Sequence, residues 1–334
     1  MIKHIDLVKQ KIKEAQTIVI TAHVSPDGDA IGSTLGLFHH LKHERAEVKV
    51  IVPNVFPEFL NWMKDTEGIL IYDQDETLAK SYFEKADIIF GLDYNETKRT
   101  AHMKEAIDSS KAYKIIIDHH IGQPDWQDLN LSTVSASSTC ELVFDFLEAY
   151  QGDLSFLNED LAYCLYTGLL TDTGSFQFSA TTPKVHRQAA FLLEAGVQAD
   201  VVHNHINNSF DEQRLQFFGF CIANRMKLVK EKKLAYIMLS QKDIHRYNIQ
   251  TGGTEGLVNE PMKIGDIDIS VLFKEDDGKV KISFRSKRDI DISAFAHKHF
   301  NGGGHRNAAG GISFKGLEET EADFLSYLKE INIP

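Results

Sequence analysis

The sequence is poor in cysteine, in signals for secretion and in long apolar runs. Its three cysteines, Cys140, Cys164 and Cys221, lie far apart and form no CxxC pair. This excludes a thiolate zinc site or redox pair of that type, and we expect inert, buried or half-buried thiols. No apolar run approaches the roughly 20 residues that span a bilayer. The N-terminus mixes charges into its apolar pattern and lacks a cleavage site, unlike a signal peptide. We therefore expect a cytoplasmic protein without a membrane partner.

Positive charge is also scarce, because 36 lysines and arginines face 48 acidic residues and give a formal net charge of -12. A sequence-independent grip on long duplex nucleic acid normally needs a basic surface. Long duplexes are therefore excluded as partners. A phosphate substrate is not, since bound metal cations can supply the local positive charge that the side chains lack.

Two domains are expected from the length of 334 residues, which exceeds what one hydrophobic core usually supports. Strand-like and helix-like segments alternate up to the strand at 113–117, with helices expected near 56–64, 76–85 and 98–110. This pattern is typical of a doubly wound, mainly parallel sheet with helices on both faces. Helical segments follow near 137–150, 157–170, 184–195 and 198–222. Strand-like runs at 225–229, 234–239, 267–273 and 280–285 then indicate a second, smaller α/β domain. We predict a catalytic domain at 1–190, a helical connector at 191–224 and a substrate-binding domain at 225–334, with no linker rich in Pro, Gly or Ser at the join.

Three apolar runs end in side chains that commonly bind metals. The run 17–22 leads into His23, 86–92 leads into Asp93, and 113–117 leads into Asp118, His119 and His120. Ligands bind beyond the carboxyl ends of the strands in open α/β sheets. The sequence therefore predicts that these side chains meet at one edge of the first sheet.

Further carboxylates lie in turns, where a plainer role is also open. Asp27 and Asp29 belong to a Pro-Asp-Gly-Asp stretch that is itself a good turn sequence, and Asp93 and Asp172 could be caps. We interpret Gly28 as a residue that takes a conformation others resist, ahead of a helix N-terminus that favours anions.

The candidate ligands combine four carboxylates with two imidazoles: His23, Asp27, Asp29, Asp93, His119 and Asp172. This mixture suits a hard or borderline divalent ion, and the absence of thiolates argues against structural zinc. Carboxylates packed together without cations would repel one another and raise their pKa values. Two metal ions would remove that repulsion, and a pair about 3.5–4 Å apart can generate hydroxide and clamp a phosphoryl group.

Phosphate-binding candidates lie mostly in the second domain. The segment Gly302, Gly303, Gly304 and His305 offers backbone N–H groups and an imidazole to an anion, although a flexible loop before a strand is the alternative. Arg285, followed by Ser286 at a strand end, offers a guanidinium fork that matches phosphate, but exposed arginines at strand ends are common. Arg99, six residues beyond Asp93, is a weaker candidate.

The order of these motifs resembles the DHH/DHHA1 phosphoesterases. The motifs are HVSPDGD at 23–29, Asp93, DHH at 118–120, TDTG at 171–174, SFRS at 283–286 and GGGH at 302–305 followed by Ala and Gly. Within that family the chain looks most like the NrnA type, which joins oligoribonuclease activity with phosphatase activity on 3′-phosphoadenosine-5′-phosphate (pAp). The resemblance implies a two-domain enzyme with its active site in the interdomain cleft. It also implies two divalent ions, which we expect to be Mn²⁺, with Mg²⁺, Fe²⁺ or Co²⁺ as alternatives.

The resemblance further assigns roles to residues. One ion would be held by His23, Asp27 and Asp93, and the other by Asp29, Asp93, His119 and Asp172, so that Asp93 bridges them. His120 would face the substrate as a phosphate donor or general acid, and Asp118 would orient the neighbouring imidazoles. In the second domain, the glycines 302–304 with His305, and Arg285, would hold the terminal phosphate or nucleotide of the substrate. Ser286 and Arg99 stay substrate-binding candidates on the pattern of the residues alone.

On this basis we expect a phosphoesterase that cuts very short single-stranded RNAs to mononucleotides and converts pAp to AMP. Long RNA should be a poor substrate. Two alternatives stay open: a phosphodiesterase for cyclic or linear dinucleotides, and a nucleotide sensor without catalysis, whose signature would be a lost metal ligand. The sequence does not say which ester is physiological, or whether the protein forms a homodimer.

Overall fold

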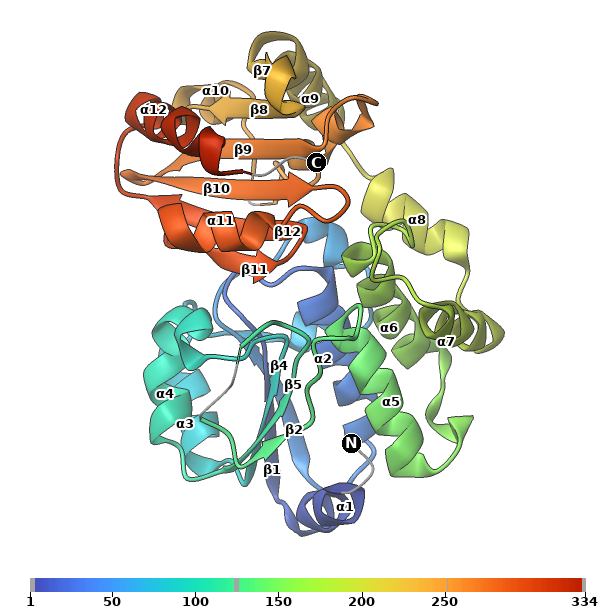
Figure 1. The fold of residues 1–334 in the computed structure, drawn as a ribbon. Coiled ribbons are helices and arrows are strands. Elements are labelled where there is room, and N and C mark those ends of the chain that lie inside the picture. Colours follow the sequence, from blue (N-terminus) through green and yellow to red (C-terminus); the bar gives the residue numbers. More distant parts are fainter. Residues whose placement is uncertain (1–3, 123–125, 251, 332–334) are drawn as a thin grey trace. The chain divides into compact units, whose positions relative to one another are not determined.

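The computed structural model describes residues 4–122, 126–250 and 252–331 of the chain (Figure 1). The chain divides into two compact units, Met1–Ser209 and Phe210–Pro334. The division falls inside the segment 191–224 that we expected to act as a connector. In the described part of the chain, no helix has the length and apolar composition that crossing a membrane requires.

The N-terminal unit is built on a parallel sheet of six strands, β1 (Thr17–Thr21), β2 (Glu47–Val52), β3 (Leu70–Ile71), β4 (Ile88–Leu92), β5 (Tyr113–Ile117) and β6 (Leu129–Asn130). Their order is β3-β2-β1-β4-β5-β6, and each neighbouring pair is parallel. Strands β1 and β4 are buried along their whole length because helices cover both faces of the sheet. The strand order reverses between β1 and β4, which is where such sheets bind ligands.

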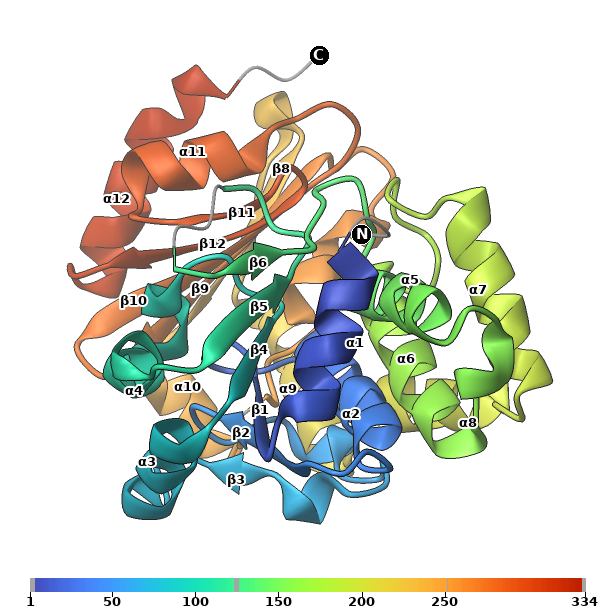
Figure 2. The same ribbon diagram turned by 90° about the horizontal axis from the view of Figure 1, so that it is seen from below.

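Helices lie on both faces of this sheet (Figures 1 and 2). One face packs against α1 (Ile5–Glu14), α2 (Gly28–Leu41), α5 (Thr139–Gln151) and α6 (Glu159–Asp172), with α7 (Pro183–Glu194) and α8 (Ala199–Asn207) joining the same core. The other face packs against α3 (Glu76–Lys85) and α4 (Lys104–Ser109). The predicted doubly wound α/β architecture is confirmed.

The C-terminal unit has a mixed six-stranded sheet. Its strands are β7 (Met226–Val229), β8 (Leu234–Leu239), β9 (Ile269–Asp276), β10 (Lys279–Ser286), β11 (Gly303–His305) and β12 (Ala308–Ser313), in the order β11-β12-β10-β9-β8-β7. All neighbours are antiparallel except β8 and β9. Helices α11 (Ile292–His299) and α12 (Leu317–Tyr327) share one core with the sheet, while α9 (Glu212–Asn224) and the 3₁₀ helix η7 (Leu257–Lys263) share another. The helix α10 (Gln241–Arg246) follows β8. The prediction of a second, smaller α/β domain is confirmed.

Several local expectations were wrong. The single helix expected at 198–222 is two, because Asp211 caps a new helix by accepting a hydrogen bond from the Arg214 N–H at 2.6 Å. The helix expected near 56–64 is reduced to the 3₁₀ turn η2 (Glu58–Leu60). The helix expected near 98–110 is η4 (Thr97–Met103) followed by α4, with a break at Ala101, whose φ is 49°. Two of the three glycines expected in a loop, Gly303 and Gly304, lie in β11, since their backbone pairs with β12.

Candidate metal centre

Three strands deliver side chains to the carboxyl edge of the parallel sheet. His23 follows β1, Asp93 follows β4 and Asp118–His120 follow β5. These strands are neighbours, and β1 and β4 flank the point where the strand order reverses. Asp93 has a φ of 65°, a left-handed conformation that Asp tolerates better than most residues and that recurs at functional sites.

The helix α2 supplies two more carboxylates at its start. Asp27 is its N-cap and accepts hydrogen bonds from the N–H groups of Asp29 and Ala30, at 3.0 and 3.1 Å. Asp29 lies in the first turn and is fully buried. Gly28, between them, was misinterpreted: its φ is not positive. A glycine is needed there for space, because a Cβ would lie 2.5 Å from the Thr171 Cγ2.

Asp172 is the last residue of α6. The chain then continues through Gly174, Ser175 and Phe176, with φ values of 57°, 60° and 64°. The C-terminal end of a helix carries partial negative charge and so favours cations. Asp172 therefore lies where both its own charge and the helix attract a metal ion.

The donor atoms of the predicted ligands converge around His119 and Asp93. The His119 Nε2 lies 3.1 Å from Asp172 Oδ2, 3.4 Å from Asp93 Oδ1 and 3.8 Å from Asp29 Oδ2. The His23 Nε2 lies 3.2 Å from the other Asp93 oxygen, Oδ2. Donor atoms of His23, Asp27 and Asp93 lie within 4.8 Å of one another, and so do those of Asp29, Asp93 and His119. Asp93 is common to both groups.

Burial and mutual repulsion set the charges in this cluster. Burial, followed by the charge of Asp93, raises the pKa of Asp29 to about 7. Burial also raises the pKa of Asp172 well above its ordinary value. For Asp93 burial acts in the same direction, but hydrogen bonds from His119 and His23 outweigh it and hold the pKa well below the ordinary value.

Burial acts on the imidazoles in the direction opposite to its effect on the carboxylates. Burial lowers the pKa of His119 and of His23, but the carboxylates outweigh it, and both pKa values are raised. Protons on these imidazoles thus balance part of the negative charge when no cation is bound. A divalent ion has to displace them, because a metal ligand must be deprotonated.

The donor set fits hard or borderline divalent cations. The His23 Nδ1 lies 2.9 Å from the Val24 carbonyl oxygen, and the His119 Nδ1 lies 3.4 Å from that of Ala136. Each Nδ1–H donates to a backbone carbonyl, which turns Nε2 toward the carboxylates as metal-binding histidines do. The nearby Cys140 is no thiolate ligand, since burial raises the pKa of its thiol well above the ordinary value.

The comparisons with known proteins agree with this geometry. The family described as "DHH family, N-terminal domain" matches residues 17–169, and the "DHHA1 domain" matches residues 231–332. A probable bifunctional oligoribonuclease and PAP phosphatase NrnA of Streptococcus mutans is 30% identical over 322 residues, 96% of each chain. The chain belongs to the DHH/DHHA1 family of phosphoesterases. As such it is a hydrolase of phosphoester bonds.

Two further relatives extend along most of the chain. The bifunctional oligoribonuclease and PAP phosphatase NrnA of Bacillus subtilis is 27% identical, with 94% of this chain and 95% of the relative covered. The crystal structure of an exopolyphosphatase-related protein from Bacteroides fragilis is 38% identical, with a TM-score of 0.92, and the match covers 98% of this chain and 96% of that one. The two-unit DHH/DHHA1 architecture is thus present in full.

The remaining residues of the DHH motif form a third group with Asp93, since donor atoms of Asp93, Asp118 and His120 also lie within 4.8 Å of one another. The His120 Nδ1 lies 2.7 Å from Asp118 Oδ1 and 3.5 Å from Asp93 Oδ1. Asp118 is 1% exposed, whereas the His120 side chain is 13% exposed. Burial, above all, lowers the pKa of His120, and the charge of Arg99 acts in the same direction. Asp118 thus engages Nδ1 of His120 and orients its imidazole.

Sequence reasoning missed the N-terminus of α5. The N–H groups of Thr139 and Cys140 donate to the two oxygens of Asp29, at 2.6 and 2.9 Å. The Thr139 hydroxyl donates to Asp93 Oδ1 at 2.9 Å. The available signal was the Ser-Ser-Thr run ahead of an apolar helical stretch, which is typical of a helix start.

Arg99 lies in η4, near the imidazoles of His23 and His120. Its carbonyl accepts a hydrogen bond from the Val24 N–H at 2.7 Å, which ties η4 to the loop after β1. Its charge opposes the protonation of both His23 and His120, so the guanidinium is within electrostatic reach of both imidazoles.

The DHHA1 unit aligns the predicted phosphate-binding residues across three strands. Arg285 on β10 pairs with Ala308 on β12, which pairs with His305 on β11. Residues paired in register share one face of a sheet, so the side chains of Arg285 and His305 flank Ala308 on the same face. The Arg285 Nη1 also donates to the Phe284 carbonyl at 2.9 Å.

The other predicted residues of this unit have clear local roles. The Ser286 hydroxyl donates to the Ile290 carbonyl at 2.8 Å and accepts from the Asn307 amide at 2.9 Å, which ties together the turn after β10. A Cβ at Gly302 would lie 2.0 Å from the Gly310 carbonyl oxygen, and Gly304 has a φ of 140°. Two of the three glycines are therefore required by the hairpin itself, and their role in substrate binding stays a prediction.

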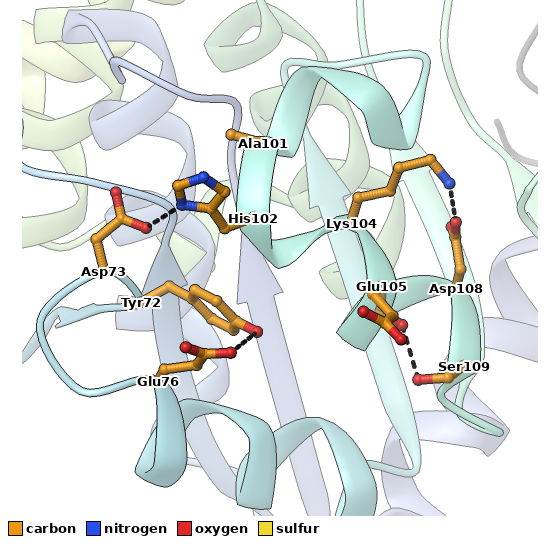
Figure 3. Close-up of a pocket in the computed structure, with 9 residues that line it drawn as sticks. All are labelled: Tyr72, Asp73, Glu76, Ala101, His102, Lys104, Glu105, Asp108 and Ser109. Atoms are coloured by element: carbon orange, nitrogen blue, oxygen red, sulfur yellow. Dashed lines mark hydrogen bonds and ion pairs between the residues drawn. The ribbon is translucent and has the colours of Figure 1, made fainter.

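The DHH unit also has a surface pocket between the start of α3 and α4, which none of the candidate metal ligands lines (Figure 3). Three of its four acidic side chains have local partners: Asp73 lies 3.1 Å from His102, Glu76 lies 3.5 Å from the Tyr72 hydroxyl, and Asp108 pairs with Lys104. None of the predicted site residues lines it.

Proposed function

We propose that this protein is a metal-dependent phosphoesterase that releases mononucleotides from very short single-stranded RNAs and converts pAp to AMP. The observation that carries the proposal is that three groups of metal-type donors share the one carboxylate of Asp93, and two of these groups contain the predicted ligands His23 and His119. The choice of substrates is supported by relatives that are named for these two activities and match along almost the whole chain.

In this proposal His23, Asp27 and Asp93 hold one divalent ion, and Asp29, Asp93, His119 and Asp172 hold the other. Carboxylates and imidazoles without thiolates suit a hard or borderline divalent ion, and the family resemblance makes Mn²⁺ the ion we expect. When bound, such a pair supplies a Lewis acid for the phosphoryl oxygens and an activated water. The number and identity of the ions are part of the proposal.

The protein's own groups orient the substrate and move the proton. Asp118 holds Nδ1 of His120 at 2.7 Å and so orients the imidazole that we propose as the donor to the phosphate or to the leaving oxygen. Arg99 places a permanent positive charge near the same imidazole. It is therefore suited to bind a phosphoryl oxygen beside the cluster.

The DHHA1 unit supplies the second part of the recognition. Arg285 and His305 share one face of its sheet, where a guanidinium fork and an imidazole can bind a terminal phosphate. Few cationic groups are involved, in keeping with the net charge of -12 and with short rather than long substrates. We also propose that the enzyme works in the cytoplasm.

A time course with Mn²⁺ and a panel of pAp, pApA, a longer RNA and cyclic di-AMP tests the substrates. Preference for pAp and the shortest linear RNA is the expected result. Preference for the cyclic dinucleotide would instead indicate a phosphodiesterase for cyclic dinucleotides. Tight binding without any hydrolysis would indicate a nucleotide sensor.

The substitution Asp93→Asn tests whether Asp93 is the shared metal ligand. Asparagine also tolerates a left-handed backbone, so the substitution removes the shared charge without straining the chain. We expect turnover to fall by roughly 100-fold or more. Replacing residues that only support metal ligands already costs about 10- to 100-fold, and Asp93 is proposed as a ligand itself. A folded variant with retained turnover would contradict the shared-ligand assignment.

A further inference from the structure

Thr139 connects two of the candidate metal ligands. It is the first residue of α5 and is fully buried. Its hydroxyl donates to Asp93 Oδ1 at 2.9 Å, and its N–H donates to Asp29 Oδ2 at 2.6 Å. Asp93 follows β4 and Asp29 lies on α2, so a single residue of a third element joins two separate parts of the fold.

The hydroxyl is not needed to cap its own helix. Ser138 is the N-cap and accepts a hydrogen bond from the Glu141 N–H at 3.0 Å. The Glu141 carboxylate in turn accepts from the Ser137 N–H at 2.7 Å. The start of α5 is therefore satisfied without the Thr139 side chain, which leaves that hydroxyl available for Asp93.

Asp93 needs such a partner if its two oxygens are to serve different ions. Its Oδ2 lies 3.2 Å from His23, whereas its Oδ1 lies on the side of Thr139 and His119. The terminal torsion of an aspartate is broad, so the carboxylate plane is not set by the backbone alone. A hydroxyl donor defines that plane and, being neutral, does not repel a cation. The β-branched side chain of threonine also restricts its own rotation.

We propose that Thr139 is a positioning residue that fixes the carboxylates of Asp93 and Asp29 relative to one another before metal ions bind. The inference rests on the metal centre proposed above. In this inference the Thr139 hydroxyl positions the Asp93 carboxylate. The backbone N–H groups of Thr139 and Cys140 position the Asp29 carboxylate.

Two substitutions separate the hydroxyl from the rest of the residue. Thr139→Val keeps the size, the β-branch and both backbone donors but removes the hydroxyl, and Thr139→Ser keeps the hydroxyl. The control is Thr167→Val: Thr167 is also fully buried in a helix, but its hydroxyl donates to the Tyr163 carbonyl of its own helix at 2.8 Å.

The measurement is Mn²⁺ binding to the metal-stripped full chain, by isothermal titration or by the EPR signal of unbound Mn²⁺, together with the unfolding temperature without metal. We expect Thr139→Val to weaken Mn²⁺ binding by about 10- to 100-fold, as substitutions behind metal ligands do. Thr139→Ser and Thr167→Val should bind Mn²⁺ like the wild type.

Three results would overturn the inference. Unchanged affinity in Thr139→Val would show that the hydroxyl does not position Asp93. Equal loss of affinity in Thr139→Val and Thr167→Val, with a matching fall in the metal-free unfolding temperature, would show a general packing effect. A wild-type chain that does not bind Mn²⁺ would remove the proposed metal centre itself, and this result is distinct from the other two.

Discussion

Gly32 on α2 lies so close to Cys164 on α6 that a Cβ at position 32 would be 2.5 Å from the Cys164 carbonyl oxygen. Gly28 and Gly36, one turn away on either side, are equally confined, with 2.5 Å to side-chain carbons of Thr171 and Leu165. Residues four apart lie on one side of a helix, so these glycines form a continuous strip that lets the two helices approach closely. Because α2 begins at the candidate ligands Asp27 and Asp29 and α6 ends at Asp172, this packing also sets the distance between metal-type donors.

The first prediction concerns this strip. Gly32→Ala should lower the free energy of unfolding by about 1–3 kcal/mol, because the clash is with backbone and cannot be relieved by rotating a side chain. It should also weaken Mn²⁺ binding, since α2 has to move away from α6. Urea unfolding and a Mn²⁺ titration measure the two effects.

Gly219→Ala is the control with the opposite expected sign. Gly219 lies inside α9, and a Cβ there would meet open space. Replacing a helical glycine by alanine should then stabilise the chain by about 0.5–1 kcal/mol. If Gly32→Ala were equally stabilising, close approach of α2 and α6 would not depend on glycine.

The edge of the sheet at which the site lies was predictable because short apolar, β-branched runs are buried strands, and the side chain that follows each run emerges at a known edge. His23, Asp93 and the residues of the DHH motif were found in this way. The sharing of Asp93 between two groups came from the family resemblance, and the structure brings the donor atoms of those groups together. Their binding of metal stays a prediction.

Other features depend on which elements pack together, which local patterns do not contain. The role of Thr139 requires the start of α5 to face Asp93 and Asp29, which are 46 and 110 residues away along the chain. Gly28 was misinterpreted because its contact with α6 is not visible in the turn sequence around it. The strand β11 was expected to be a loop because glycine disfavours strands, and pairing with β12 overrides that preference.

The second prediction is that Mn²⁺ stabilises the DHH unit. Burial and repulsion by Asp93 raise the pKa of Asp29 to about 7, because the imidazoles balance only part of the negative charge of the metal-free cluster. At a free Mn²⁺ concentration 100 times the dissociation constant, the gain for one site is about 2.7 kcal/mol. A thermal melt with and without EDTA detects this gain. Asp93→Asn should lose the response and Arg285→Gln, in the other unit, should keep it, whereas a response that persists in Asp93→Asn would place the ion elsewhere.

The third prediction separates catalysis from metal binding. Asp118→Asn should lower kcat on pAp by about 10- to 100-fold, because the amide no longer holds Nδ1 of His120 as a carboxylate does. Mn²⁺ affinity should stay within about twofold, since our proposal assigns Asp118 to neither ion, although its donor atoms lie near those of Asp93 and His120. The control for loss of charge alone is Asp65→Asn. The Asp65 carboxylate pairs with Lys42, and Asp65 is not among the proposed site residues. An Asp118→Asn enzyme that loses Mn²⁺ affinity to the same extent as kcat would show that Asp118 is a ligand.

The fourth prediction uses pH in the DHHA1 unit. Arg225 donates two hydrogen bonds to Asp243, at 2.9 and 2.7 Å, and this partner lowers the pKa of the buried carboxyl. A carboxyl whose pKa is lower in the folded chain stabilises the fold above its unfolded pKa of about 3.9. That contribution is lost as the pH falls through the lower, folded pKa. Asp243→Asn should therefore cost about 1–3 kcal/mol at neutral pH.

The difference between Asp243→Asn and the wild type should then narrow as the pH falls below about 4, where the wild-type carboxyl is also losing its charge. Unfolding of the full chain at a series of pH values measures it. Asp289→Asn is the control, because its side chain is 99% exposed and lies 3.8 Å from Arg306, and exposed pairs contribute at most about 1 kcal/mol. A gap for Asp243→Asn that stayed constant with pH would mean that the amide disturbs the cap of α10, where Asp243 also accepts from Ser240, rather than the charge pair with Arg225.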